Sequence, residues 1–155
     1  MSLTERLHFF HQAIAWKGEI PLQSRYSMGV AGERFFREIK DNGRLMATRC
    51  PNCGYTYLPA RLYCERCFAE LTEWVEVPPR GKVYAFTVVH FDLEEKPLEK
   101  PRVLALVEFE GSDGGLIHDL EGVAPDRVEI GMPVEVVFKQ ERNGSILDIA
   151  GFQPL

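Results

Sequence analysis

Apolar positions at the start of the chain recur with the spacing of a helix. They are separated by steps of four, three and four residues, which places them on one helix face: Leu3, Leu7, Phe10 and Ile14. Ser2, with Glu5 three residues later, fits a capping box at the start of this helix. The stretch from Gly18 to Pro21 interrupts the pattern, so the predicted helix ends before it.

A second, shorter helix is predicted from about Gly32 to Lys40. Phe35, Phe36 and Ile39 share its apolar side. The tripeptide Asp-Asn-Gly at residues 41–43 ends this helix, because Asn and Gly readily adopt the left-handed conformation of a helix C-cap. The two helices together form an expected N-terminal region that spans residues 1–43.

From residue 81 onward the chain contains short runs that alternate apolar and polar positions and are rich in β-branched and aromatic residues. They predict five strands, at residues 81–91, 101–110, 114–123, 132–142 and 145–154. Turn residues, including Asn143-Gly144, separate them. Residues 93–101 carry two prolines and three glutamates, which disfavour regular structure and predict a charged loop. Residues 124–131 leave room for only a short helical turn.

Five antiparallel strands in a segment of this length fit a small Greek-key barrel of the OB type. An SH3-like barrel and a split sandwich are the alternatives. The predicted fold class is therefore mainly β with N-terminal helices. Residues 44–76, which hold two C-x-x-C pairs typical of a zinc ribbon, precede a five-stranded OB-type barrel. The expected division is into N-terminal helices at residues 1–43, a ribbon at residues 44–76 and a barrel at residues 77–155.

All four cysteines of the chain stand in two C-x-x-C pairs, ten residues apart. A tight turn within each pair points both sulfurs inward, and two such turns give the four-thiolate tetrahedron of a structural zinc site: Cys50, Cys53, Cys64 and Cys67. Gly54 permits the left-handed turn that follows the first pair. Phe68 stands at the equivalent position of the second pair, so that turn is expected to be looser. Iron also accepts four thiolates.

Redox and disulfide roles are the alternatives for these cysteines. A thioredoxin-type motif is a single C-x-x-C that opens a helix after a strand, whereas these pairs are tandem and the first follows a short extended run. With all four thiols committed to metal, no cysteine remains as a nucleophile. The sequence also lacks the G-x-S-x-G, phosphate-loop and H-E-x-x-H signatures, so no catalytic residue is assigned.

The charge is divided unevenly along the chain, whose formal net charge is −5. Residues 83–155 hold fourteen acidic and six basic side chains, a net charge of −8, whereas residues 44–82 have a net charge of +2. A zinc ribbon beside an OB barrel is also an arrangement found in nucleic-acid-binding proteins, but a barrel of this charge would repel a phosphate backbone. Nucleic-acid binding is therefore the disfavoured alternative.

The sequence shows no targeting or membrane-spanning signal. The N-terminal residues lack a basic leader followed by an apolar stretch, and no apolar run approaches about 18 residues. We therefore expect a cytoplasmic protein without a membrane span. In that compartment, four clustered cysteines indicate metal more than disulfides.

The order of helix, ribbon and barrel resembles one family, the acyl-CoA-associated proteins that pair a rubredoxin-like zinc ribbon with a C-terminal OB fold. The matching segments lie within residues 32–154 and read GERFFREIKDNGRLMATRCPNCGYTYLPARLYCERC, W-V-E-V, GKVYAFTVV, IGMPVEVVF and GFQP. The resemblance implies a non-catalytic scaffold subunit that binds acyl-CoA. It also implies association with a thiolase-superfamily enzyme, such as a thiolase or a hydroxymethylglutaryl-CoA synthase, whose own cysteine would carry out the acyl chemistry.

The phosphates of coenzyme A need cations, and residues 44–66 carry four arginines against one glutamate. Arg61, in the strip between the cysteine pairs, is the first candidate for contact with a phosphate or with the partner, and the further candidates are Arg49, Arg80 and Lys82. Phe35 and Phe36 are candidates for an apolar trough that holds the acyl group, with packing in the core as the alternative. The N-terminal helices could also dock the enzyme or a second copy of the chain, which would make a homo-oligomer.

Overall fold

The computed structural model describes residues 27–155 of the chain. The helix predicted around Leu3 to Ile14 lies outside these residues. The first elements in chain order are α2 (Gly29–Asn42), β1 (Leu45–Arg49), β2 (Thr56–Tyr57) and β3 (Glu73–Val77). They are followed by β4 (Arg80–Phe91), β5 (Pro97–Phe109), β6 (Gly115–Asp119), the short 3-10 helix η1 (Pro125–Arg127), β7 (Pro133–Phe138), a second 3-10 helix η2 (Ile146–Asp148) and β8 (Ile149–Pro154).

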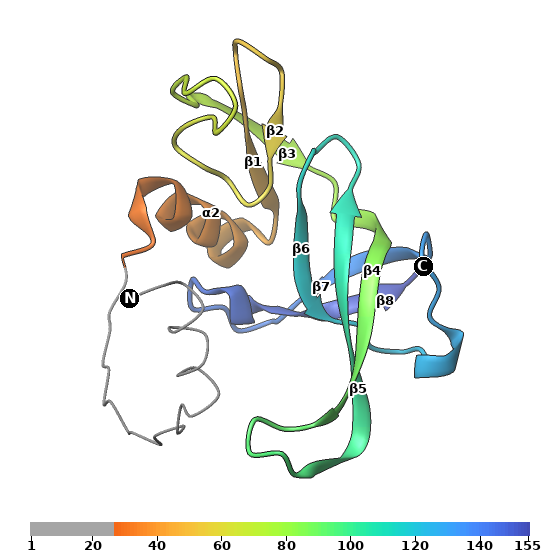
Figure 1. Ribbon diagram of the computed structural model, residues 1–155. Coiled ribbons are helices and arrows are strands. Elements are labelled where there is room, and N and C mark those ends of the chain that lie inside the picture. Colours follow the sequence, from red (N-terminus) through yellow and green to blue (C-terminus); the bar gives the residue numbers. More distant parts are fainter. Residues whose placement is uncertain (1–26) are drawn as a thin grey trace, which may run out of the picture.

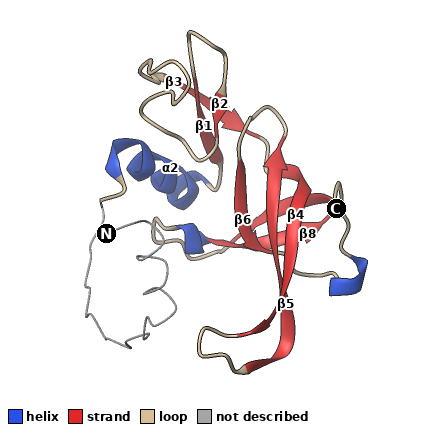
Figure 2. Cartoon of the chain, in the orientation of Figure 1, coloured by secondary structure: helices blue, strands red, loops and turns tan. Residues whose placement is uncertain are grey.

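The strands form two antiparallel sheets (Figure 2). One sheet has the order β2-β1-β3, and the other has the order β6-β5-β4-β7-β8. The larger sheet closes on itself just after β6, where Leu120 forms a parallel bridge with Phe152 of β8 and the Glu121 N–H donates to the Phe152 carbonyl at 2.8 Å. Closure removes the free edges of the sheet and gives a five-stranded barrel of the OB type. The predicted fold class is confirmed.

Figure 1 shows the small sheet at one end of the barrel, helix α2 beside it, and the β4–β5 hairpin projecting from the opposite end. Within residues 27–155, no helix combines the length and the apolar character that crossing a membrane requires.

Helix α2 includes the predicted segment and begins three residues earlier. Phe35 and Ile39 are buried on its inner side, as the periodicity predicts. The helix ends at Gly43, whose φ of 61° is left-handed and whose N–H donates to the Ile39 carbonyl at 3.0 Å. A glycine in this position satisfies a carbonyl of the last turn without the steric cost of a side chain, so the predicted helix end is confirmed.

One hydrophobic core runs without interruption from α2 through the base of the small sheet into the barrel. Its buried members come from all three parts and include Ile39, Leu45, Ala47, Val77, Val107, Val134 and Phe152. The outer part of the small sheet has a separate cluster of only four buried residues: Cys50, Tyr57, Cys64 and Leu71. Two of these four are cysteines, so much of the buried side-chain surface at the tip belongs to predicted metal ligands and little of it to aliphatic side chains.

The turn between β5 and β6 fixes the small sheet on the barrel. The Thr56 N–H donates to the Asp113 carboxylate at 2.8 Å, and the Asp113 N–H donates back to the Thr56 carbonyl at 2.9 Å. The Tyr55 hydroxyl donates to the Asp113 carbonyl at 2.9 Å. A Cβ on Gly114 would lie 2.2 Å from the Leu58 carbonyl oxygen, so only glycine allows this approach of the two backbones.

The β4–β5 hairpin is longer than the sequence pattern predicts. Strand β5 begins at Pro97, so the prediction of a loop over residues 93–101 is wrong for its second half. Pro97 pairs with Phe91, but the register shifts between Val89 and Phe91, and residues 98–101 have no partner in the ladder. The N–H that Pro101 lacks is therefore not needed there, which is how a strand tolerates proline.

The connection between β7 and β8 also differs from the prediction. A strand was expected from residue 145, but Ser145 is the N-cap of η2, which spans Ile146–Asp148, and the strand starts at Ile149. The buried Asp148 carboxylate accepts the N–H groups of Asn143, Gly144 and Ser145 at 2.9, 2.6 and 3.2 Å. Burial raises the pKa of Asp148, but the three N–H donors outweigh it, and the pKa is lowered from its ordinary value.

Replacing Asp148 by Asn should lower the free energy of unfolding by about 1–3 kcal/mol at neutral pH, because three backbone N–H groups lose a charged acceptor. A pKa that is lower in the folded state stabilises the fold above the unfolded-state value, near 3.8, and that contribution is lost as the pH falls through the folded-state pKa. The difference in the free energy of unfolding between wild type and variant should therefore become smaller below about pH 4. Urea unfolding across this pH range measures the difference, and Asp126→Asn, at an exposed position, is the control. Equal free energies of unfolding of wild type and Asp148→Asn at pH 7 would contradict the prediction.

Candidate functional site

The four predicted metal ligands come together at the tip of the small sheet. All four Sγ atoms lie within 4.8 Å of one another, with 3.4 Å between Cys50 and Cys67 and 3.6 Å between Cys53 and Cys64. A tetrahedral ion with metal–sulfur distances of about 2.3 Å separates its sulfurs by about 3.8 Å. The cysteines therefore fit one four-coordinate metal ion, held as a closed structural site with no position left for substrate.

The two cysteine pairs have the same backbone geometry. The Gly54 N–H donates to the Cys50 carbonyl at 2.9 Å, and the Phe68 N–H donates to the Cys64 carbonyl at 2.8 Å. Both residues are left-handed, with φ of 74° for Gly54 and 60° for Phe68. The expectation of a looser second turn is therefore wrong. Metal ligation requires the same turn in both pairs, so Phe68 adopts a conformation that costs a side-chain-bearing residue about 1–2 kcal/mol.

Tyr57 of β2 supports the metal ligands from inside the tip. Its buried hydroxyl lies 3.2 Å from the Cys64 sulfur, and it accepts the Glu65 N–H at 3.2 Å. With one acceptor function used by Glu65, the hydroxyl proton is free to point at the sulfur. The tyrosine thus stabilises the thiolate form of Cys64, which is the form that binds metal.

The surroundings of Cys64 favour its ionised form. Burial raises the pKa of this thiol, but the Tyr57 hydroxyl and the backbone N–H groups of Cys67 and Arg66 outweigh burial and lower the pKa to about 6. Burial, followed by the hydrogen bond to Cys64, raises the pKa of Tyr57 to about 12. The tyrosine thus remains a proton donor to sulfur at every physiological pH.

The variant Tyr57→Phe should weaken metal binding about 10–100-fold, the usual effect of removing a hydrogen bond to a ligand. Competition with a chromophoric chelator measures the affinity. Tyr55→Phe is the matched control, because that hydroxyl bonds to the Asp113 carbonyl instead of a sulfur. Equal affinities of the two variants would contradict a role for Tyr57 in holding Cys64.

Arg61, the first candidate for a ligand contact, is engaged within the ribbon. It forms an ion pair with Glu65, and its guanidinium lies 5.4 Å from the centre of the Tyr57 ring. The buried Thr48 hydroxyl fixes the backbone beneath it, since it accepts the Arg61 N–H at 2.9 Å and donates to the Arg61 carbonyl at 3.0 Å. Arg49 is exposed and has no ion-pair partner within residues 27–155.

The two phenylalanines of α2 have different surroundings. Phe35 is 1% exposed and belongs to the shared core, so its placement speaks against a ligand contact and agrees with the alternative of core packing. Phe36 is half-buried beside it, with ring centres 5.3 Å apart. A contact of Phe36 with a ligand or a partner stays a prediction.

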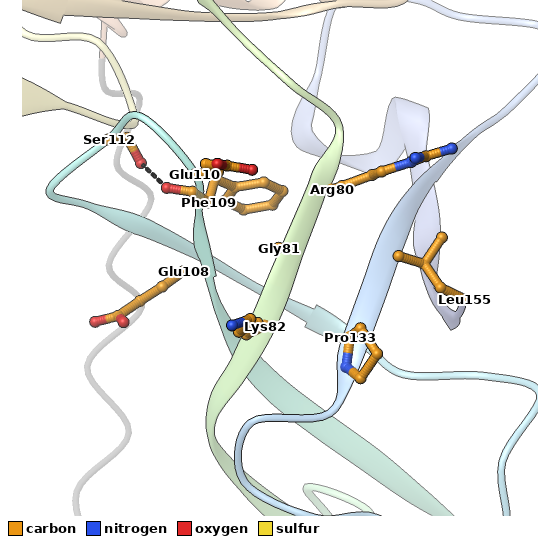
Figure 3. Close-up of a pocket in the computed structure, with 9 residues that line it drawn as sticks. All are labelled: Arg80, Gly81, Lys82, Glu108, Phe109, Glu110, Ser112, Pro133 and Leu155. Carbon is orange, nitrogen blue, oxygen red and sulfur yellow. Dashed lines mark hydrogen bonds between the residues drawn. The ribbon is translucent and has the colours of Figure 1, made fainter.

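Arg80 and Lys82, the remaining candidates, line a cavity of about 510 Å³ at the start of β4 (Figure 3). The rest of the lining comes from the end of β5 and the turn after it, from the start of β7 and from the last residue of the sequence: Glu108, Phe109, Glu110, Ser112, Pro133 and Leu155. Neither Arg49 nor Arg61 is part of this lining. The structure therefore separates the predicted cations into one group on the ribbon and another on the barrel.

The register of β4 against β5 builds this cavity. Gly81 pairs with Phe109, and Lys82 pairs with Glu108. A Cβ on Gly81 would lie 2.3 Å from the Glu108 carbonyl oxygen, so glycine is required for the close approach. The lining residues of β5 were not predicted, because the alternating apolar runs do not reveal which residues of two strands pair. Gly81 was a usable signal, since a glycine inside a predicted strand often marks a close approach of two backbones.

Comparison with known proteins agrees with this architecture. The domain described as ChsH2, rubredoxin-like zinc ribbon domain, matches residues 37–73, and the domain described as ChsH2, C-terminal OB-fold domain, matches residues 74–139. A DUF35 domain-containing scaffold protein from Methanocaldococcus jannaschii is 34% identical over 108 residues, which cover 69% of this chain and 76% of the relative. The fold and the four-cysteine site define a zinc-ribbon protein with an OB barrel, and the chain belongs to the DUF35 family of such proteins.

Two further similarities connect the family with enzymes. A chain of the solved Ltp2-ChsH2(DUF35) aldolase superposes with a TM-score of 0.63 at 30% identity, over 84% of this chain and 98% of that chain. A probable enoyl-CoA hydratase alpha subunit from Thermomonospora curvata is 38% identical over 101 residues, which cover 64% of this chain but only 31% of that protein.

Proposed function

We propose that this chain is a non-catalytic scaffold subunit that binds acyl-CoA and associates with a thiolase-superfamily enzyme, either a thiolase or a hydroxymethylglutaryl-CoA synthase-type enzyme. The observation that carries this proposal is the likeness over nearly the whole length of a chain in the Ltp2-ChsH2(DUF35) aldolase. The scaffold name of the Methanocaldococcus relative supports the non-catalytic part. So does the metal site, since it uses every cysteine of the chain and leaves no thiol for acyl transfer.

The cavity beside β4 is the place that suits coenzyme A best. A volume of about 510 Å³ falls within the usual range of ligand pockets, about 300–1,000 Å³. Arg80 and Lys82 stand two residues apart on one strand, so both cations can reach the same side of a ligand. Neither has an ion-pair partner within the part of the chain that the structure describes. Two free cations at one cavity mouth suit phosphate groups.

The rest of the lining suits the other parts of the same ligand. Glu108 and Glu110 supply acceptors for groups that donate hydrogen bonds, such as an adenine amino group or the amides of a pantetheine arm. Pro133 and Leu155, which are both exposed, supply apolar contact. A ligand that combines phosphates, hydrogen-bond donors and an apolar segment matches this mixture better than a simple anion, which the two carboxylates would repel.

The double variant Arg80→Ala, Lys82→Ala should bind coenzyme A at least tenfold more weakly, because each lost charged hydrogen bond is worth about 1.5–3 kcal/mol. Isothermal titration calorimetry with coenzyme A measures this. Lys139→Ala, which removes an exposed cation of the same barrel, is the control. An unchanged affinity in the first variant, together with a loss in Arg49→Ala, Arg61→Ala, would move the ligand site to the ribbon.

Purification of the tagged full-length chain from its native host at moderate salt tests the enzyme partner. A thiolase-superfamily enzyme should be recovered in near-stoichiometric amount and identified by mass spectrometry. Nucleic acid with its processing proteins, released by nuclease or by raised salt, would instead support the nucleic-acid alternative and overturn the proposal.

A further inference from the structure

The second cysteine pair is followed by a phenylalanine at a position whose backbone conformation favours glycine. Phe68 and Gly54 occupy equivalent positions in the two turns, with φ of 60° and 74°. A Cβ on Gly54 would meet nothing within 4 Å, so glycine serves there for its backbone conformation and not for lack of space. The metal-binding turn explains the left-handed conformation of Phe68, but it does not explain why a phenylalanine is present.

Packing within the described residues does not offset the strain at Phe68. Its side chain is 83% exposed, and it belongs neither to the buried cluster at the tip nor to the side chains packed against that cluster. Strained residues of this kind concentrate at functional positions. An exposed aromatic side chain that no internal contact requires is suited to a contact outside the chain.

The same hairpin carries a second exposed aromatic side chain. Residues 62–71 fold back on themselves, and Tyr63 forms an antiparallel bridge with Glu70. Cys64 and Leu71, the neighbours of this pair, are buried, and successive side chains of an extended segment point to opposite sides. Tyr63 therefore points outward, and it is 61% exposed. The outer side of the hairpin thus presents two aromatic rings.

The metal site holds the turn of this hairpin in one conformation. The Phe68 N–H donates to the Cys64 carbonyl at 2.8 Å. Cys64 and Cys67, which lie within the turn, are both in the set of four metal ligands. The backbone of Phe68 is therefore fixed before a partner binds, and the association loses little conformational entropy at this position.

The charges of the hairpin select among occupants. Residues 61–71 hold two arginines and two glutamates, which cancel, and Arg61 is ion-paired with Glu65. Four thiolates around a divalent ion add a net charge of −2. Nucleic acid and anionic lipid need a surplus of cations, which these residues lack. A second copy docked tip against tip would bring two anionic metal centres together. The hairpin therefore suits an apolar pocket on a different protein.

We propose that Phe68, together with Tyr63 of the same hairpin, is the anchor by which the ribbon tip docks into an apolar pocket of the partner enzyme. The inference rests on the proposed function only for the identity of that enzyme. Aromatic side chains that fill a pocket of the partner provide a large share of the binding energy of an interface. Phenylalanine at this position thus lowers the stability of the turn and makes a contact that glycine could not make.

Site-specific photocross-linking in the native host tests the docking anchor on the full-length chain. A benzophenone amino acid at position 68 replaces one aromatic side chain by another and should form an adduct with a second protein, through an apolar peptide. The same amino acid at position 93 is the matched control and should form none, because Leu93 is 99% exposed but lies between β4 and β5 of the barrel. The proposal fails if position 68 forms no adduct, if both positions react equally, or if position 68 reacts with nucleic acid or with this chain in the same or another copy.

The variants Phe68→Gly and Leu93→Gly provide the quantitative form of this test, with the cross-linked protein as the binding partner. Phe68→Gly should weaken the complex by about tenfold or more, because the anchor is lost. It should bind zinc at least as tightly as the wild type in competition with a chromophoric chelator, because glycine adopts the turn without strain. Leu93→Gly should leave both affinities unchanged.

The two affinities distinguish a docking role of Phe68 from a structural one. An unchanged complex, or a weaker complex accompanied by weaker zinc binding, would overturn the proposal, since the second result would show that Phe68 acts only by holding the metal turn. If the cross-linked protein is not a thiolase-superfamily enzyme, the proposed function fails while the docking anchor stands.

Discussion

The shared hydrophobic core is the constraint on which the other parts of the molecule depend. Helix α2, the base of the ribbon and the barrel each have one apolar side, and the same buried cluster covers all three. None of the three can be displaced without exposing side chains of the others to water, which costs about 25 cal/mol for each Å² of apolar surface. The described residues 27–155 are therefore joined by one core, although two separate domain descriptions match them.

The tip of the ribbon is the exception, because it lies beyond the reach of this core. Its few buried residues include two of the four ligands, and a cluster of that size does not hold a loop by hydrophobic burial alone. The metal supplies the missing free energy, and the strained conformation of Phe68 is tolerated on that account. The cavity lies instead on the barrel, whose geometry the core maintains. The four-cysteine tip and the candidate ligand cavity thus lie on different parts of one chain.

The sequence predicted features that depend on local spacing. Cysteine spacing identified the metal site, helical periodicity with Gly43 identified α2, and alternating runs identified the barrel strands. What it could not predict depends on the pairing of distant segments. Asp113 looks like an ordinary turn residue until the fold places it against Thr56. Pro101 looks like a loop residue until the register shift leaves it without a ladder partner inside strand β5. The unbroken apolar run from Val103 to Val107 indicates a strand with apolar side chains on both faces, and this feature was not predicted.

The backbone contact between Gly114 and Leu58 has a mechanical consequence. With no side chain between the two backbones and three hydrogen bonds beside them, the ribbon has no hinge on the barrel. The spacing between the metal tip and the barrel surface is therefore fixed before any assembly forms. A protein that contacts both the ribbon tip and the barrel surface binds two sites at a fixed spacing. Its second contact therefore forms without the entropy loss of aligning two loosely tethered modules.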